Sequence, residues 1–143
     1  MDRLKLLVVL LKAHDAVMRC LEEDIRGYGL NFTEFMVLEV LFHKGTMPIQ
    51  KIGSAVRLTS GSATYAVDKL EDKGFLRRVP CPKDRRVIYA ELTEGGDVFM
   101  SEIFPKHSET IHRIFAPLAD EEVLPMTDAL KRLGCHAHDI RNR

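Results

Sequence analysis

The side chains best suited to chemistry in this sequence are cations, and they gather in one short segment. Between Arg77 and Arg86 there are five basic residues and one acidic residue, Asp84, which gives a local charge of plus four. Arginine and lysine bind phosphates, and an arginine on a projecting loop can enter the narrow minor groove of DNA. The segment therefore predicts a nucleic-acid-binding loop, braced by an ion pair between Asp84 and an arginine. The residues of this segment assigned to DNA binding are Arg77, Lys83, Asp84, Arg85 and Arg86.

A second candidate surface precedes the basic segment, on a helix predicted from Ser60 to the residue before Gly74. Ala63, Val67 and Leu70 share one face of this helix and are expected to point inward. Small hydroxyl side chains on the other face suit close approach to phosphates and base edges, because backbone N–H groups at a helix N-terminus point outward. The expected N-cap, Thr59, belongs to the same surface. The helix residues predicted to contact DNA are Thr59, Ser60, Ser62, Thr64, Tyr65 and Lys69.

The elements around these residues follow the order of a winged helix-turn-helix. Apolar residues at helical spacing from Ile49 to Val56 predict a short helix before the turn. Gly74 is expected to end the second helix in a left-handed conformation, and residues 75–79 and 87–92 have the composition of two short strands. The polar, proline-bracketed residues 80–85 then form the basic tip of a hairpin. This arrangement predicts one helix in the major groove of DNA and an arginine of the hairpin in the adjacent minor groove.

In these motifs the sequence resembles the MarR family of bacterial transcriptional regulators. The shared features are a leucine-lysine-glycine helix end, the Asp-x-Arg pair of Asp84 and Arg86, and the closing Leu-Thr-x-x-Gly of Leu92, Thr93 and Gly96. The resemblance implies a mainly α fold with a small β-hairpin wing, and a homodimer that binds an inverted repeat in duplex DNA. The alternative is a winged helix that binds protein or structured RNA, which would not select duplex DNA by sequence.

The segments outside 31–92 are predicted to be long helices. Residues 3–26 carry more apolar side chains than one packed face can hold, and because wide apolar surfaces are seldom left exposed, a second subunit is inferred. Thr93 is the expected N-cap of the next long helix, and Asp120 that of the last. Pro105 should kink the former. The expected organisation is a single domain, 1–143, with a winged helix-turn-helix in 31–92 and dimerisation helices in 1–28 and 93–143.

The second helix has a clear start signal. Asn31 as N-cap with Glu34 three residues later resembles a capping box, in which each side chain accepts a hydrogen bond from the other residue's backbone N–H. Leu30 and Phe35 can form the accompanying hydrophobic staple. Apolar residues from Phe35 to Phe42 are then expected to face inward.

Charge is segregated along the chain, which reconciles a formal net charge of zero with nucleic-acid binding. From Glu91 to Asp128 there are nine acidic residues and two basic ones. A basic wing on a molecule with an acidic far side helps to orient the protein on DNA and limits nonspecific binding. At 143 residues and 45% hydrophobic composition, the chain can bury one ordinary core.

Other classes of protein find little support. Three scattered cysteines without CxxC spacing argue against a disulfide framework, and the lack of a signal peptide or membrane-length apolar run predicts a cytoplasmic protein. No Gly-rich phosphate loop, HExxH or GxSxG motif occurs, so neither an enzyme nor a cofactor is expected. One cluster near the C-terminus comes from a single helix end without a second ligand pair, so no metal is expected either. That cluster is Cys135, His136, His138 and Asp139.

Control of DNA binding is predicted to come from a small molecule or an oxidant. The wing sequence Cys-Pro-x-Asp-Arg-Arg and the Ile-Phe-Pro-x-His of 103–107 resemble the MarR branch that responds to quinone-like and phenolic compounds. His14 interrupts an apolar helix face, where a polar group is either a satisfied interface histidine or an anchor for a ligand in an apolar cleft. Cys81, between two prolines and near cations, is the candidate redox residue. The candidate ligand-binding residues are His14, Met18, Phe35, Leu38 and Phe99.

Overall fold

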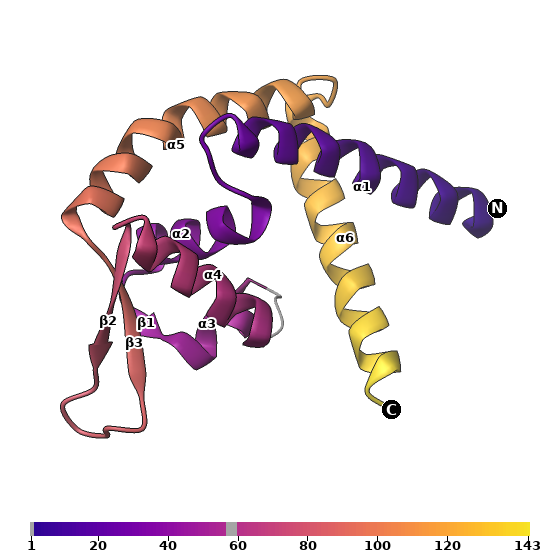
Figure 1. The fold of residues 1–143 in the computed structure, drawn as a ribbon. Helices are drawn as coiled ribbons and strands as arrows, with labels where there is room; N and C mark the ends of the chain where they lie inside the picture. The colour runs from indigo at the N-terminus through magenta and orange to yellow at the C-terminus, as the bar shows by residue number, and fades with distance from the viewer. Residues whose placement is uncertain (1, 57–59) are drawn as a thin grey trace. The chain divides into compact units, whose positions relative to one another are not determined.

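A computed structural model describes residues 2–56 and 60–143, and within them the chain forms six helices and three short strands (Figure 1). The mainly α fold with a β-hairpin wing is confirmed. The chain divides into two compact units, one up to Thr110 and the other Ile111–Arg143. In chain order the elements are α1 (Arg3–Arg26), α2 (Phe32–Lys44), β1 (Met47–Pro48), α3 (Ile49–Ala55), α4 (Ser60–Asp72), β2 (Leu76–Pro80), β3 (Ile88–Leu92), α5 (Glu94–Phe115) and α6 (Asp120–Arg141).

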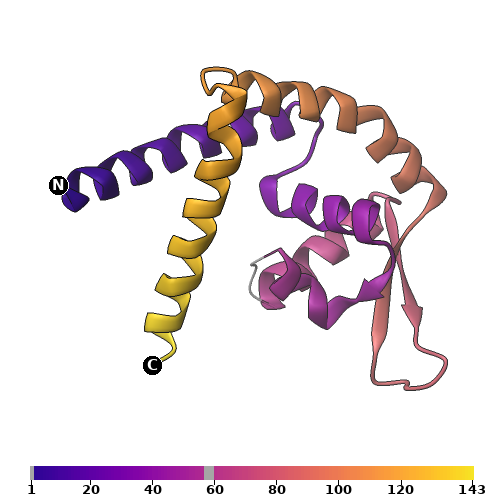
Figure 2. The same cartoon turned by 180° about the vertical axis from the view of Figure 1, so that it is seen from behind.

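The strands form one antiparallel sheet in the order β1-β3-β2. β2 and β3 pair along their whole length, with Arg78 opposite Ala90, and Ala90 also pairs with Met47 of β1. In the views of Figures 1 and 2 the β2–β3 hairpin extends away from the helices α2 to α4. β1 was not predicted, because a two-residue strand that ends in proline has no alternation to detect.

The core of the first unit is built on α2. Phe35 and Leu38 are fully buried, together with Ile52 of α3 and Val67 of α4. The predicted inner face of α4 is confirmed, since Ala63, Val67 and Leu70 are buried; Ala66, which was not predicted, is buried beside them. Burial of this continuous apolar stripe holds α4 against α2 and leaves its opposite face exposed.

The end of α4 is a Schellman motif, as the glycine after it predicts. Gly74 has a φ of +79°, its N–H donates to the carbonyl of Glu71 at 3.0 Å, and the N–H of Phe75 donates to the carbonyl of Leu70 at 3.0 Å. Glycine adopts this left-handed conformation without the steric cost that a Cβ would add. The chain therefore reverses sharply and leads directly into β2.

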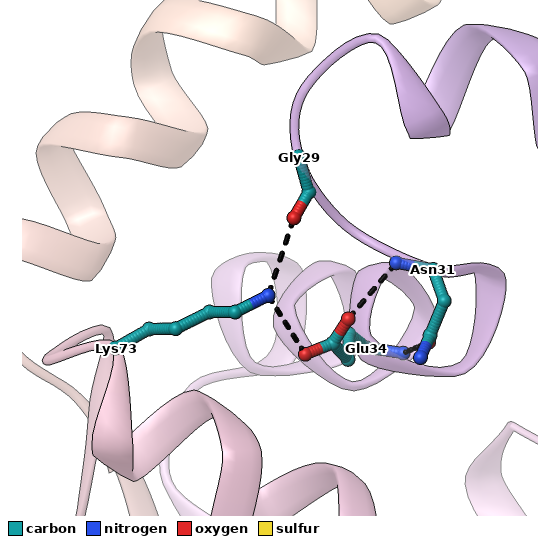
Figure 3. Close-up of polar contacts among 4 residues, drawn as sticks. All are labelled: Gly29, Asn31, Glu34 and Lys73. Carbon is teal, nitrogen blue, oxygen red and sulfur yellow. Dashed lines mark hydrogen bonds and ion pairs between the residues drawn. The ribbon is translucent and has the colours of Figure 1, made fainter.

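The capping box of α2 is confirmed, and Glu34 has a further partner. Its Oε1 accepts the N–H of Asn31 at 2.9 Å, while Asn31 Oδ1 accepts the N–H of Glu34 at 2.8 Å. Its Oε2 accepts a hydrogen bond from Lys73 Nζ at 3.0 Å, and the same Nζ donates to the Gly29 carbonyl at 3.2 Å (Figure 3). One buried carboxylate thus joins the α1–α2 turn, the start of α2 and the end of α4.

A tight junction links the hairpin to α5. Thr93 is confirmed as the N-cap, because its Oγ1 accepts the N–H of Gly96 at 3.0 Å. The same hydroxyl donates to the Gly74 carbonyl at 2.6 Å, and the Thr93 N–H donates to the Phe75 carbonyl at 3.1 Å. The rings of Phe75 and Phe99 stack with centroids 4.4 Å apart. The start of α5 is therefore held directly against the end of α4.

A polar cluster joins the end of α1 to α5. Asp24 Oδ1 accepts hydrogen bonds from Tyr28 Oη and Thr110 Oγ1, each at 2.8 Å, and its Oδ2 lies 2.9 Å from Nδ1 of His107. Burial acts to raise the pKa of Asp24, but the bonds from His107, Tyr28 and Thr110 together lower that pKa below its ordinary value of 3.8. Burial and the nearby Asp24 raise the pKa of Tyr28. The cluster is thus an anionic carboxylate held by three donors.

The predicted start of α6 is wrong by one residue. The N-cap of α6 is Ala119 and not Asp120, which is the first helical residue; Glu122 accepts the Ala119 N–H at 3.0 Å. Aspartate stabilises the first turn of a helix through the dipole without acting as the cap, which accounts for the error of one position. Pro105 lies inside α5 without ending it.

Apolar side chains remain exposed on α1 and on α6. Within the described residues, α1 buries only Ile25 and α6 buries none. No helix in the described part of the chain has the length and apolar character needed to cross a membrane. On these two helices, the most exposed large apolar residues are Leu4, Leu6, Val9 and Leu11 of α1, and Leu124 and Ile140 of α6.

Substitution of Gly96 should destabilise the fold, because a Cβ at this position would lie 1.9 Å from the carbonyl oxygen of Phe75. Backbone atoms cannot move aside cheaply, so Gly96→Ala should lower the free energy of unfolding by about 1–3 kcal/mol in a urea titration. Gly95→Ala is the matched control, since its nearest neighbours would lie at 3.5 and 3.6 Å and alanine favours the helix. Equal stability of the two variants would contradict this account of the junction.

The Asp24 cluster should make stability depend on pH. Because the pKa of Asp24 is lower in the folded chain than in the unfolded chain, its contribution is complete above the unfolded value and is lost as the pH falls through the folded value. Asp24→Asn should lower the free energy of unfolding by about 1–3 kcal/mol at pH 7, and the difference should shrink in acid. Asp15→Asn, which alters an exposed pair with His14, should change little. A pH-independent difference for Asp24→Asn would count against the ionised cluster.

Candidate nucleic-acid interface

The outer face of α4 presents polar side chains, as the helical spacing predicts. Ser62, Thr64, Tyr65 and Lys69 are exposed, and Tyr65 keeps 62% of its surface accessible. Lys69 Nζ lies 5.3 Å from the centre of the Tyr65 ring, a cation–π distance that draws the two side chains together. Of the other residues predicted here, Thr59 lies outside the described residues and Ser60 is described only as the first residue of α4.

The hairpin tip is braced by Asp84, as predicted. Asp84 Oδ1 accepts the backbone N–H of Arg86 at 3.0 Å and its Nε at 3.2 Å, and Oδ2 lies 3.4 Å from a terminal guanidinium nitrogen. The hydrogen bonds from Arg86 lower the pKa of Asp84, so the carboxylate stays ionised. Arg86 nevertheless remains 91% exposed. The pair shapes the loop and leaves the guanidinium at the surface.

Three further cations of the hairpin divide into two groups. Arg77 pairs with Glu91 across the strands, at 2.7 Å. Lys83 and Arg85 are exposed at the tip, and neither has an ion pair among the residues that the structure describes. Within the hairpin, the positive charge that no described residue neutralises is therefore concentrated at the tip, where phosphates can approach it.

Arg78 is a site residue that the sequence pattern alone does not single out. Its guanidinium contacts the carboxylates of Asp68 and Glu71 on α4, the latter at 2.6 Å. Consecutive strand residues point to opposite faces, so Arg77 and Arg78 cannot share one surface. That alternation, together with two acidic residues one turn apart on α4, is the signal that could have indicated this pairing.

Comparison with known proteins places this arrangement in a family. The MarR family model matches residues 30–88. The HTH-type transcriptional regulator MhqR of Bacillus subtilis (strain 168) is 45% identical over 140 residues, which cover 98% of this chain and 97% of that protein. The chain belongs to the MarR family.

Solved structures extend the agreement to the MarR fold as a whole. The MarR family regulator Sco3205 of Streptomyces coelicolor, solved in complex with DNA, matches with a TM-score of 0.84 and 20% identity, over 94% of this chain and 88% of that one. BpsR of Bordetella bronchiseptica, solved in a study of how 6-hydroxynicotinic acid regulates its DNA binding, matches with a TM-score of 0.81 and 19% identity, over 91% and 98% of the chains. In the MarR fold, α4 occupies the position of the second helix of the helix-turn-helix, and the β2–β3 hairpin is the wing.

The candidate effector residues of this MarR chain lie in different environments. Phe35 and Leu38 are core residues of α2, and the Phe35 ring packs on His107 with centroids 4.4 Å apart. Phe99 is half-buried in its stack with Phe75. Met18 is half-buried on α1, whereas His14 is exposed with its Nδ1 3.3 Å from Asp15 Oδ1. The structure groups Phe35 with Leu38; within the described residues, no hydrogen bond or ring contact links His14 to the other four.

The wing cysteine is part of the hairpin's own structure. Cys81 is a half-buried free thiol, and its N–H donates to the carbonyl of Val87 at 3.0 Å. This bond extends the pairing of β2 and β3 toward the tip. A redox role for Cys81 stays a prediction.

Proposed function

We propose that this chain is a homodimeric transcriptional repressor that binds an inverted-repeat operator in duplex DNA and is released from it by a small aromatic or quinone-like compound. The main observation behind the proposal is that an exposed recognition helix, α4, lies next to a basic wing. The wing's tip cations, Lys83 and Arg85, have no ion pair among the described residues. The MarR relatives support it, and the protein would act in the cytoplasm, where it meets the chromosome.

The two parts of the interface have different roles in this proposal. The recognition helix lies in the major groove, where the hydroxyl and aromatic side chains reach base edges and phosphates. The wing contacts the adjacent minor groove and its phosphates, with Asp84 holding Arg86 in place. The proposed DNA-contacting or wing-bracing residues are Thr59, Ser60, Ser62, Thr64, Tyr65, Lys69, Arg77, Lys83, Asp84, Arg85 and Arg86.

Dimerisation follows from the terminal helices. The apolar residues exposed on α1, and separately those on α6, provide surface that a second subunit would bury. A twofold dimer places two recognition helices in successive major grooves, so the operator should be an inverted repeat with half-sites about 10–10.5 base pairs apart.

Effector control is proposed on the likeness to regulators with aromatic ligands, BpsR among them. The ligand-binding residues in the proposal are His14, Met18, Phe35, Leu38 and Phe99, with His14 as the polar group that orients the ligand. The competing proposal is a winged helix that binds protein or RNA. Among the described residues, no side-chain arrangement specifically favours it.

The DNA-binding proposal is tested by selecting bound sites from random duplexes with the purified protein. We expect an inverted repeat, and a fall of about 1 in the salt slope of operator binding for each of Lys83→Ala and Arg85→Ala, because each loses one phosphate contact. Lys106→Ala, which removes an exposed cation of α5, is the matched control and should leave the slope unchanged. Selected sites without dyad symmetry, or two wing variants that bind like the wild type, would refute the assignment.

Effector control is tested by titrating phenolic and quinone compounds into the free dimer and into its operator complex. By linkage, an inducer that weakens DNA binding must bind the operator complex more weakly by the same factor, about 5- to 150-fold. Equal affinity for both forms would rule out that compound as the inducer. A response lost in Cys81→Ser and reversed by a thiol reductant would instead assign control to the wing.

A further inference from the structure

We infer that Arg78 is a positioning residue that clamps the wing to the recognition helix, so that both reach the DNA as one unit, and that it does not itself contact the DNA. This inference rests on the proposed function, since it concerns how the same interface is built. By composition alone, Arg78 would be counted with the other wing cations as a DNA-binding residue. The contacts between β2 and α4 support it.

The clamp joins main chain as well as side chains. Arg78 donates from one terminal nitrogen to Asp68 and from the other to Glu71 Oε1, at 2.6 Å. The backbone N–H of Arg78 also donates to Glu71 Oε2, at 3.3 Å. Glu71 therefore binds the strand itself, and the position of β2 relative to α4 is fixed at this residue.

The spacing of the carboxylates suits one guanidinium. Asp68 and Glu71 are three residues apart, so they are neighbours on the helix surface. A guanidinium is a planar fork with several N–H donors in fixed directions, which allows one arginine to bind both carboxylates, whereas a lysine offers a single ammonium. Arg78 is only 31% exposed, compared with 62% for Arg77 and 91% for Arg86. Its charge is thus committed to the protein.

The clamp lies between the helix surface and the hairpin tip. Asp68 follows Thr64 by four residues and Tyr65 by three, so it lies one turn beyond the proposed base-contacting residues. Arg78 is the middle residue of β2, between buried Leu76 and the start of the tip at Pro80. A change in the angle between wing and helix would therefore move the tip cations relative to the recognition helix.

If Asp68 and Glu71 acted only through their charge, they would weaken DNA binding. Two negative charges beside a DNA-binding surface repel phosphates, so their removal should tighten binding to any duplex. If they act through Arg78, their removal frees the wing and should weaken binding to the operator, which requires helix and wing to be in register. The two accounts can be separated because they differ in sign.

The experiment is a mutant cycle in which binding to the operator and to a nonspecific duplex is measured. The first variant is Arg78→Gln, the second, the carboxylate variant, combines Asp68→Asn with Glu71→Gln, and the third carries all three substitutions. We expect the neutralised carboxylates to weaken operator binding about tenfold, without weakening nonspecific binding. Arg78→Gln should also weaken operator binding about tenfold in the wild-type background and cost almost nothing once the carboxylates are neutralised. Unchanged or tighter operator binding by the carboxylate variant would overturn the inference. So would an Arg78→Gln substitution that weakens operator binding by the same factor in both backgrounds.

Two controls make the outcome specific. Asp72→Asn removes an exposed carboxylate of α4 that has no ion pair within the described residues, and it should not weaken operator binding. Lys83→Gln should cost the same in both backgrounds, as expected for a direct phosphate contact.

If Arg78→Gln fails to fold, the carboxylate variant alone still decides the sign. If the wild type selects no duplex at all, the proposed function fails, an outcome distinct from a wild type that selects an operator with an ineffective clamp.

Discussion

The buried carboxylate of Glu34 is the interaction on which the winged-helix region depends. A charged group with only 5% of its surface exposed is costly unless donors surround it, and here Asn31 and Lys73 supply them. Lys73 also binds the carbonyl of Gly29. The end of α4, the turn that leaves α1 and the start of α2 therefore share one anchor (Figure 3).

The wing shows how one basic segment is divided by geometry into different roles. Arg86 is held by its neighbour Asp84, Arg77 by Glu91 of the facing strand, and Arg78 by two carboxylates of α4. The wing cations that have no ion pair among the described residues, Lys83 and Arg85, lie at the tip. A chain with zero net charge can bind a polyanion in this way, because the field at a surface depends on where charges are paired.

The terminal helices α1 and α6 differ from α2, α3 and α4 in how their apolar side chains are covered. The first core is closed by α2, α3, α4 and the start of α5, whereas most of α1 and all of α6 leave apolar side chains accessible. Burial of such surface contributes in proportion to its area, so a helix of this kind gains stability by association. A MarR chain thus divides its apolar residues between folding and a proposed dimer.

Local signals by themselves determined much of this protein: the capping box at Asn31, the glycine end of α4, the Thr93 cap, and the Asp84–Arg86 brace all act within a few residues. The same local reasoning placed the α6 cap one residue late. Only the tertiary structure decided the partners that are distant in sequence. Strand β1, the bond from Lys73 to Glu34 and the contacts of Arg78 with α4 depend on how the elements pack, and Gly96 must be glycine because the backbone of Phe75 approaches it. Periodicity records which face of an element is buried, but it carries no information on which distant side chain meets it there.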